Sequence, residues 1–400
     1  MGSALAQNKL NRPLFLQILA FIATRLVFNT MHRMVYPFLP FFMRGLGVDL
    51  TQISTALSIR SASGALSPFL AVVADSRGRK TGMLLGTTLF VVGVTLVAIY
   101  PVFWTFLVAL FLSTGGYLVF IPSMQAYLGD RVPYEKRGLP LALTELSWSL
   151  SFILGVPLAG LMISRWGWTS PFPWLAGLGL LALVGLARLL PADPPVSRLN
   201  PNLWVNFRTV LASPLALIGL AMGVSFTIAN EVVNLVFGIW MEGTFGFELV
   251  ALGLVAVGIG LAEFGGEALV GGVVDRLGKV RAVTFGLLAN CAAALALAAL
   301  GSSLAGAVAC LILFYLTFEF TIVSSLPLMS EILPEARATL LAANIALISL
   351  GRAAGAWLAP RFFEIGSSQT ILFNALAAVG FNLLALLALS FLRRIDIRST

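Results

Sequence analysis

The stretch Ala71-Val-Val-Ala-Asp75-Ser-Arg-Gly-Arg79-Lys80 marks the point at which a long apolar run ends and a cluster of charge begins. A similar stretch, Gly271-Gly-Val-Val-Asp275-Arg276-Leu-Gly-Lys279, follows 200 residues later. A second pair of segments, 129–138 and 331–337, repeats at nearly the same distance, and each holds a proline followed by an arginine. An internal repeat of this kind determines the architecture of a chain. These similarities predict two copies of one unit.

The composition indicates that these two units lie in a lipid membrane. The chain is 59% hydrophobic and only 10% charged, whereas soluble domains average about 25% charged residues. Apolar segments of roughly 20 residues, the length needed to cross a bilayer as a helix, recur along it. They are continuous rather than alternating, which favours helices over a barrel. The sequence predicts an all-α membrane protein with twelve spans, near 14–38, 49–73, 81–100, 103–128, 138–163, 170–190, 213–240, 248–273, 281–300, 303–329, 338–362 and 368–392.

The expected organisation is two pseudo-symmetric bundles of six helices, at 14–190 and 213–392. The segment 191–212 begins with a proline-rich stretch and is interpreted as the linker between them. Short tails, 1–13 and 393–400, complete the chain, which we expect to be a monomer.

The net charge of +8 reports orientation rather than a nucleic-acid partner. With the N-terminus inside, 18 Lys and Arg residues fall on the cytoplasmic side, three outside and four within spans. This is the positive-inside bias. The first apolar run is too long for a cleavable signal peptide. We therefore expect a multi-pass protein of the plasma (inner) membrane with both termini in the cytoplasm.

The residues that carry most cofactor and enzyme chemistry are scarce. His32 is the single histidine, so no metal-ligand spacing exists. Cys291 and Cys310 both fall inside predicted helices. This position argues against a disulfide and favours a role as small apolar residues in helix packing. A nucleophile elbow and a phosphate-binding glycine loop are missing from the sequence. We expect neither a cofactor nor a metal, and no enzymatic activity.

Polar residues recur on one face of the first span, which predicts that this face lies against protein or water. They are Gln17, Arg25, Asn29, His32 and Tyr36. We interpret this stripe as lining a cavity, and the alternative is a structural stripe bonded to neighbouring helices. The adjacent Arg33 could instead extend outward along the helix to the membrane surface.

Further ionisable residues lie within the other spans, where a charge at the helix centre costs at least about 2.5–3.5 kcal/mol. Arginines dominate the first half and carboxylates the second, with Arg60, Arg352 and Glu267 among them. Such residues indicate substrate recognition or proton coupling, and the alternative is ion pairs between helices. The candidates for a substrate and proton cavity are Arg25, Asn29, His32, Glu145, Trp148, Glu231, Asn234, Glu263 and Glu319.

At this point the sequence resembles the major facilitator superfamily over residues 14–392. The family signature between the second and third helices is roughly G-x-x-x-D-R-x-G-R-[KR]. The first copy matches it at Asp75, Gly78, Arg79 and Lys80, but has Ala71 and Ser76 at two other positions. The second copy, 271–280, matches Gly271, Asp275, Arg276 and Gly278 and lacks the final basic pair.

The resemblance implies a role for these loops as a latch between the halves on the cytoplasmic side. It implies that role for Asp75, Arg79, Asp275 and Arg276. Such an aspartate can accept hydrogen bonds from helix N-terminal N–H groups and pair with arginines. The alternative is that the basic residues only anchor the loop at the lipid headgroups.

The resemblance also implies a transporter, and it leans toward the drug and metabolite efflux branch. Pro157 and Gly160 match part of the fifth-helix signature of those antiporters, whereas Val156 and Leu161 depart from it. The expected function is secondary active transport of a small molecule by alternating access, with proton-coupled efflux. The alternatives are a proton-coupled uptake symporter and a lipid flippase or lysolipid transporter on the same fold. The expected partners are the substrate, protons and membrane lipid.

Overall fold

The computed structural model describes residues 12–70, 78–133, 136–193, 203–365 and 370–399 of the chain. Within these ranges the regular elements are all helices. Their bounds are α1 (Arg12–Met34), α2 (Leu39–Leu46), α3 (Leu50–Ala62), η2 (Ser63–Leu66), α5 (Arg79–Ile99), α6 (Phe103–Arg131), α7 (Gly138–Glu145), α8 (Ser147–Leu150), η4 (Ser151–Gly155), α9 (Val156–Trp166), α10 (Pro171–Leu189), α11 (Leu203–Ala212), α12 (Pro214–Asn234), α13 (Phe237–Phe245), α14 (Leu249–Leu277), α15 (Lys279–Leu300), α16 (Leu304–Ile332), η5 (Pro334–Ala336), α17 (Arg337–Ile365) and α18 (Leu372–Ser399).

Eleven helical segments of the described chain are long and apolar enough to cross a membrane. They correspond to eleven of the twelve predicted spans. The remaining one, predicted at 49–73, begins as α3, passes through the 3-10 turn η2 and is helical again at 67–70. Its last residues lie outside the described ranges. The prediction of an all-helical membrane protein is confirmed, and the count of twelve stays a prediction.

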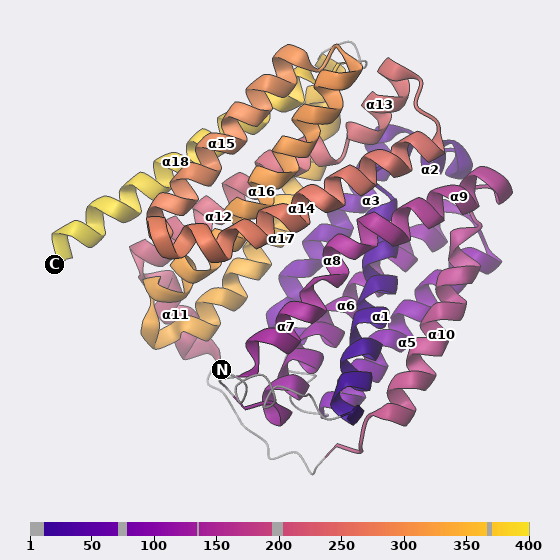
Figure 1. Ribbon diagram of the computed structural model, residues 1–400, viewed down its shortest axis with the longest axis horizontal. Helices are drawn as coiled ribbons and strands as arrows, with labels where there is room; N and C mark the ends of the chain where they lie inside the picture. The colour runs from indigo at the N-terminus through magenta and orange to yellow at the C-terminus, as the bar shows by residue number, and fades with distance from the viewer. Residues whose placement is uncertain (1–11, 71–77, 134–135, 194–202, 366–369, 400) are drawn as a thin grey trace, which may run out of the picture.

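The helices form two groups that follow the two halves of the chain (Figure 1). The first group runs from α1 to α10 and the second from α12 to α18, with α11 between them in sequence. We call the end at which α10 finishes and α12 begins the linker end. The opposite end, where α2 and α13 lie beside each other, is called the far end.

The repeated sequence corresponds to repeated local geometry. Gly78 and Gly278 each precede a helix with positive φ, +96° and +79°, a backbone conformation that glycine adopts without a steric penalty. The next residue of each copy forms an ion pair with the end of the following helix. Arg79 pairs with Asp130 at 3.3 Å, and Lys279 pairs with Glu331. The two halves therefore use one construction at the linker end.

Two spans are irregular where a side chain of a neighbouring helix comes close to a glycine. The fifth predicted span passes through the wide π turn η4, and a Cβ at Gly155 would lie 1.9 Å from the Thr30 hydroxyl of α1. At η2, a Cβ at Gly64 would lie 2.4 Å from the hydroxyl of Ser349 on α17. Helices often adopt such turns where function or packing requires a local bend. Both turns lie on helices that contact the other half.

Within the first half, α5 and α6 touch through glycines. A Cβ at Gly116 would lie 2.3 Å from the Gly86 carbonyl oxygen, and a Cβ at Gly86 would lie 2.5 Å from the Gly116 oxygen. Because both obstacles are backbone atoms, a larger side chain can be accommodated only if the two helices separate. Small residues at such crossings are typical of helix packing in membranes.

Gly116→Ala is therefore expected to destabilise the protein by about 1–3 kcal/mol, the usual effect of overpacking. This outweighs the gain of about 1 kcal/mol that alanine brings to a helix interior. The matched control is Gly115→Ala on the same helix, where a Cβ meets nothing within 4 Å. Thermal unfolding in detergent should separate the two variants, and equal melting temperatures would contradict the packing described above.

Candidate functional site

The polar face of α1 divides into two parts in the structure. Four residues of the stripe lie at the centre of the molecule, where they contact side chains of other helices: Arg25, Asn29, His32 and Tyr36. Gln17 does not join them: its amide donates to the Leu189 carbonyl of α10 and accepts from the Tyr127 hydroxyl. The prediction that the whole stripe lines a cavity is wrong for Gln17, because neighbouring helices of its own half satisfy its side chain.

Arg33 is the strongest polar connection between the halves. It does not extend to the membrane surface, since its side chain and that of Glu263 on α14 are each 4% exposed. Its Nη2 lies 2.6 and 2.7 Å from the two carboxylate oxygens of Glu263, and its Nη1 donates to the Trp148 carbonyl at 2.9 Å. The guanidinium lies 3.5 Å from the Phe152 ring centroid and 4.3 Å from that of Trp148. Charge, hydrogen bonds and stacking thus hold it in one position.

A second polar chain crosses between the halves through Tyr36. Arg60 of α3 donates to the Tyr36 hydroxyl at 2.6 Å, and this hydroxyl donates to Glu231 of α12 at 2.8 Å. The other oxygen of Glu231 accepts from Asn234, which in turn accepts from the Tyr315 hydroxyl of α16 at 2.6 Å. Glu231 is fully buried, and every one of its partners is another side chain of this chain. These bonds compensate for the removal of its charge from water.

Arg25 and Glu145 form a third pair, this time inside the first half. The two guanidinium nitrogens lie 2.7 Å from the two carboxylate oxygens, which is a bidentate arrangement. Arg25 is buried, but the Glu145 side chain is 48% exposed. Two residues later, Ser147 accepts a hydrogen bond from Asn29. Glu145 is therefore accessible from the space on the linker side of the buried network.

A small cavity of about 20 Å³ lies at the centre of this network. A cavity of that size holds about one water molecule, so it is too small for an organic substrate. It is lined by side chains of both halves: His32, Arg33, Tyr36, Trp148, Phe152, Asn230, Asn234, Glu263, Tyr315, Phe318, Glu319 and Arg352.

Three cavity groups differ from the rest in their bonding. Glu319 is 9% exposed and makes no hydrogen bond or ion pair with the described part of the chain. The Asn230 side-chain nitrogen is buried and has no partner among the described residues. Arg352 has one distant ion-pair contact, 3.9 Å from Glu231. A carboxylate, an amide donor and a guanidinium are thus available to a ligand or to water.

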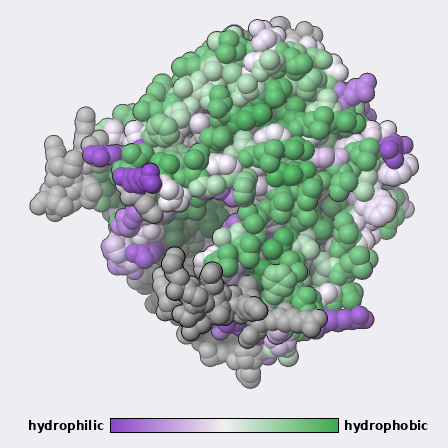
Figure 2. Space-filling model, viewed as in Figure 1, coloured by the Kyte–Doolittle hydropathy of each residue, from purple (hydrophilic) through white to green (hydrophobic). Residues whose placement is uncertain are grey.

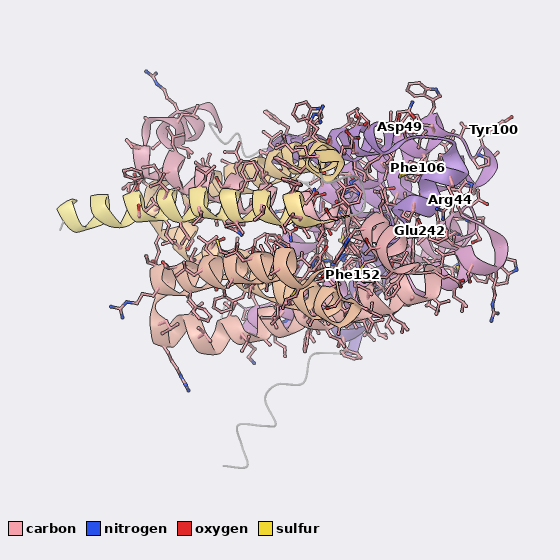
Figure 3. All side chains as sticks on the ribbon, turned by 90° about the horizontal axis from the view of Figure 1, so that it is seen from above. Arg44, Asp49, Tyr100, Phe106, Phe152 and Glu242 are labelled. Carbon is pink, nitrogen blue, oxygen red and sulfur yellow. The ribbon has the colours of Figure 1, made fainter. Side chains whose placement is uncertain are left out.

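The halves are in close contact from the far end to this cavity. At the far end, a Cβ at Gly238 would lie 2.5 Å from the Pro37 carbonyl oxygen, and Arg44 pairs with Glu242 at 2.8 Å (Figure 3). At mid-depth, a Cβ at Gly260 would lie 2.9 Å from Phe152. Toward the linker end, Figure 2 displays a hollow between the two groups of helices. The described chain is closed at the far end and opens at the linker end.

The predicted latch residues are only partly described. Asp75 lies outside the described residues, and so does the side chain of Asp275. Arg79 pairs with Asp130 of α6 inside its own half, and Arg276 is exposed at the end of α14. A latch between the halves therefore stays a prediction.

Asp193 performs the capping that was predicted for Asp75. It accepts hydrogen bonds from the Lys80 and Thr81 backbone N–H groups of α5, at 2.8 and 2.9 Å. Burial alone would raise the pKa of Asp193, but these backbone bonds and one from the Thr81 hydroxyl lower it below the usual 3.8. Asp193 lies in the segment predicted to be the linker, and this capping role was not predicted. The signal available was an acidic residue beside a proline at the end of a span.

Three members of the network were not among the candidates for the substrate and proton cavity: Arg60, Tyr36 and Tyr315. The available signal for Arg60 was an arginine near mid-depth in a span, which is costly unless it has a partner. Tyr36 had such a signal, since it lies on the polar face of the first span, whereas Tyr315 had none, because a tyrosine is common in membrane helices.

The sequence of this chain is similar to a known family profile and to several bacterial proteins. The Major Facilitator Superfamily profile matches residues 15–356. The Bacillus subtilis protein YbcL, described as an uncharacterized MFS-type transporter, is 26% identical over 82% of this chain and 83% of its own length. YwfA of the same organism, described in the same way, is 30% identical, and the aligned region spans 34% of each chain. A multi-drug resistance efflux pump PmrA homolog of Lactococcus lactis is 30% identical over 39% of this chain and 38% of its own.

Solved structures share the fold at low identity. A POT family transporter in complex with 5-aminolevulinic acid superposes with a TM-score of 0.78 and 15% identity, over 95% of this chain and 97% of the other. The match of the profile over most of the residues, together with a helical architecture that agrees with it, is decisive. The chain belongs to the Major Facilitator Superfamily, a family of membrane transporters.

Proposed function

We propose that this chain is a secondary active transporter that exports a small molecule by alternating access and that proton binding drives the cycle. The observation that carries this proposal is the buried network between the halves, in which Arg33–Glu263 and Tyr36–Glu231 cross from one group of helices to the other. Beside them, Glu319 is a buried carboxylate without a partner among the described residues. Such a network can connect protonation, substrate binding and the separation of the halves.

Alternating access is supported by the position of the contacts. The described chain is closed by Arg44–Glu242 and by backbone packing at the far end, and it opens at the linker end. The opposite form requires the far-end contacts to part and the linker ends of the two halves to meet. Rocking of one half against the other about the central cavity is the simplest motion that does both.

Proton coupling is supported by the chemistry of the two inter-half carboxylates. A proton on Glu263 would remove the charge that holds Arg33, and a proton on Glu231 would change its bond with the Tyr36 hydroxyl from acceptor to donor or break it. Either change weakens the closed contact at mid-depth. A substrate that engages Glu319 or Arg352 would act on the same set of charges.

Export is favoured over the alternatives by two observations. Relatives described as multi-drug resistance efflux pumps align with this chain, and the aligned PmrA protein of Streptococcus pneumoniae covers 62% of it. The central lining carries charged and amide groups, which suits a polar or charged substrate better than the acyl chains of a lipid. A proton-coupled uptake symporter would use the same residues with the opposite direction of flux.

Glu319→Gln is expected to lower proton-driven transport at least tenfold, because glutamine keeps the size of the side chain but cannot take up a proton. The measurement is a screen of cationic, anionic and zwitterionic compounds in proteoliposomes with an imposed pH gradient, scoring compound flux and proton flux together. Glu231→Gln is tested in the same way. The exposed Glu364 of α17 provides the control variant Glu364→Gln, which should transport as the wild type does. Undiminished coupled transport in both cavity variants would remove them from the coupling role.

Breaking the Arg33–Glu263 pair on one side is expected to destabilise the described state more than removing both charges. Glu263→Gln leaves a buried guanidinium without its counter-ion, which typically costs about 3–5 kcal/mol. The double variant Arg33→Gln with Glu263→Gln removes that penalty. Thermal unfolding of the two single variants and the double variant forms a cycle, and strictly additive effects would mean that the two side chains are not coupled.

Locking the far end is expected to stop transport. In a chain without its native cysteines, Arg44→Cys with Glu242→Cys places two thiols where an ion pair now joins α2 and α13. A short bifunctional thiol reagent should abolish transport if this end must open in every cycle, and a cleavable reagent should allow recovery on reduction. The single variant Arg44→Cys, treated in the same way, is the control. Full transport by the cross-linked protein would refute alternating access through this end.

A further inference from the structure

A large cavity outside the central site lies in the second half of the chain. Its volume is about 970 Å³, and α12, α14, α15, α16 and α18 contribute to its wall. None of the residues proposed above for transport lines it. It is therefore separate from the central network.

The cavity lies at the level where spans end. Leu215 is the second residue of its span, Lys279 is the first of its span, and Ile332 is the last of its span. Val274 and Leu392 each directly precede a charged residue that ends an apolar run of the sequence. Five helices thus place a residue from the end of an apolar run in its wall. Since span ends mark the boundary between the hydrocarbon and the headgroups, the mouth of the cavity lies in the headgroup region of the membrane.

The cavity is polar at its mouth and apolar at depth. Along α15 the lining passes from Lys279 and Arg281 to Phe285 and Leu288. Nine residues separate Lys279 from Leu288, which is roughly 13 Å along a helix at 1.5 Å per residue. Phe285 and Leu288 are exposed in the protein alone, so an apolar partner must cover them in the membrane. A charged mouth above an apolar wall matches a phospholipid in both polarity and direction.

The charge at the mouth selects the headgroup. Glu331 is paired with Lys279, whereas the exposed Arg281 makes no ion pair or hydrogen bond with the described part of the chain. Figure 2 displays hydrophilic groups gathered at the linker ends of α14 and α15, next to the apolar face. A net positive mouth attracts an anionic headgroup, and basic pockets between membrane helices bind such lipids.

The corresponding place in the first half is closed. There a Cβ at Gly78 would lie 2.4 Å from the Asp193 side chain, whereas a Cβ at Gly278 meets none of the described residues within 4 Å. Lys80 donates to the carbonyl oxygens of Ala187 and Leu190 at 2.7 Å and so ties α5 to the end of α10. The residue at the equivalent position of α15 is Val280, which has no such donor. The open cavity is thus a feature of the second half and not of the repeated plan.

We propose that this cavity binds one anionic phospholipid of the leaflet at the linker end, with its headgroup on Arg281 and an acyl chain along Phe285 and Leu288. The site is independent of the proposed transport function. The headgroup supplies the counter-charge that the described residues do not give Arg281. The acyl chain covers apolar side chains that would otherwise face an empty or wet cavity.

The test measures lipid binding to the full-length protein in detergent by native mass spectrometry. The probes are phosphatidylglycerol and phosphatidylcholine with identical acyl chains. One phosphatidylglycerol molecule is expected to bind at least fivefold more tightly than phosphatidylcholine. Arg281→Gln should reduce this preference about fivefold, the size expected for one basic side chain near an anionic lipid surface. Arg165→Gln, which removes an exposed arginine at the far end, is the control and should leave the preference unchanged.

A second variant tests the apolar part of the cavity. Thr284→Trp fills the wall between the mouth and Leu288, and it should weaken binding of both lipids without changing the charge. Its melting temperature checks that it folds. Equal binding of the two lipids by the wild type, or an unchanged preference in Arg281→Gln, would overturn the proposal. Displacement of the lipid by millimolar glycerol 3-phosphate would overturn it as well, because it would indicate a site for soluble anions.

Discussion

The contact between Arg33 and Glu263 is the interaction on which the described arrangement of the two halves depends. It joins α1 to α14 with both side chains 4% exposed, so breaking it without a replacement partner leaves charge buried. Such a break typically costs about 3–5 kcal/mol. The Arg44–Glu242 pair at the far end is of a different kind, since the Arg44 side chain is 58% exposed. Exposed pairs contribute only about 0.2–1 kcal/mol. The barrier to separation therefore lies at mid-depth and not at the far end.

This comparison explains how a family transporter can hold a closed end without fixing it there. The far end is sealed mainly by shape, through the contact of Gly238 with the Pro37 and Tyr36 carbonyl groups. Shape contacts of this kind are lost all at once when two rigid bodies tilt. In the proposed cycle, a proton or a bound charge at the network beside the cavity decides whether tilting is favourable, because it changes the energy of these buried charges by several kcal/mol. Chemistry at the centre can thereby control access at both ends.

The sequence was sufficient to predict an all-helical membrane protein, and two kinds of evidence in it act at different scales. The repeat around Asp75 and Asp275 predicted two similar halves, and the structure repeats the geometry at Gly78 and Gly278. Helical periodicity placed Arg25, Asn29 and His32 on one buried face, as described. Periodicity describes a single helix, however, and says nothing about which helix lies opposite. For this reason the partners of Arg33 and Glu231 could not be predicted.

The irregular helical turns could not be predicted from the sequence, for a related reason. The π turn η4 and the 3-10 turn η2 arise where Gly155 meets Thr30 and Gly64 meets Ser349, contacts between residues far apart in the chain. The role of Asp193 is similar, because it accepts from the N–H of Lys80, 113 residues earlier, at the start of α5. Each of these features depends on a tertiary contact. The secondary-structure propensities of a short stretch of sequence contain no information about such contacts.

The two halves share a plan but carry opposite charges at mid-depth, and this divergence is necessary for the network. The first half supplies Arg33 and Arg60, and the second supplies Glu231 and Glu263. Two identical units would face each other with like charges, which repel in a low-dielectric interior. A repeated unit can therefore become a closed pair only after its copies have acquired complementary side chains. The same freedom to diverge left Lys80 closing one linker-end site and Val280 leaving the other open.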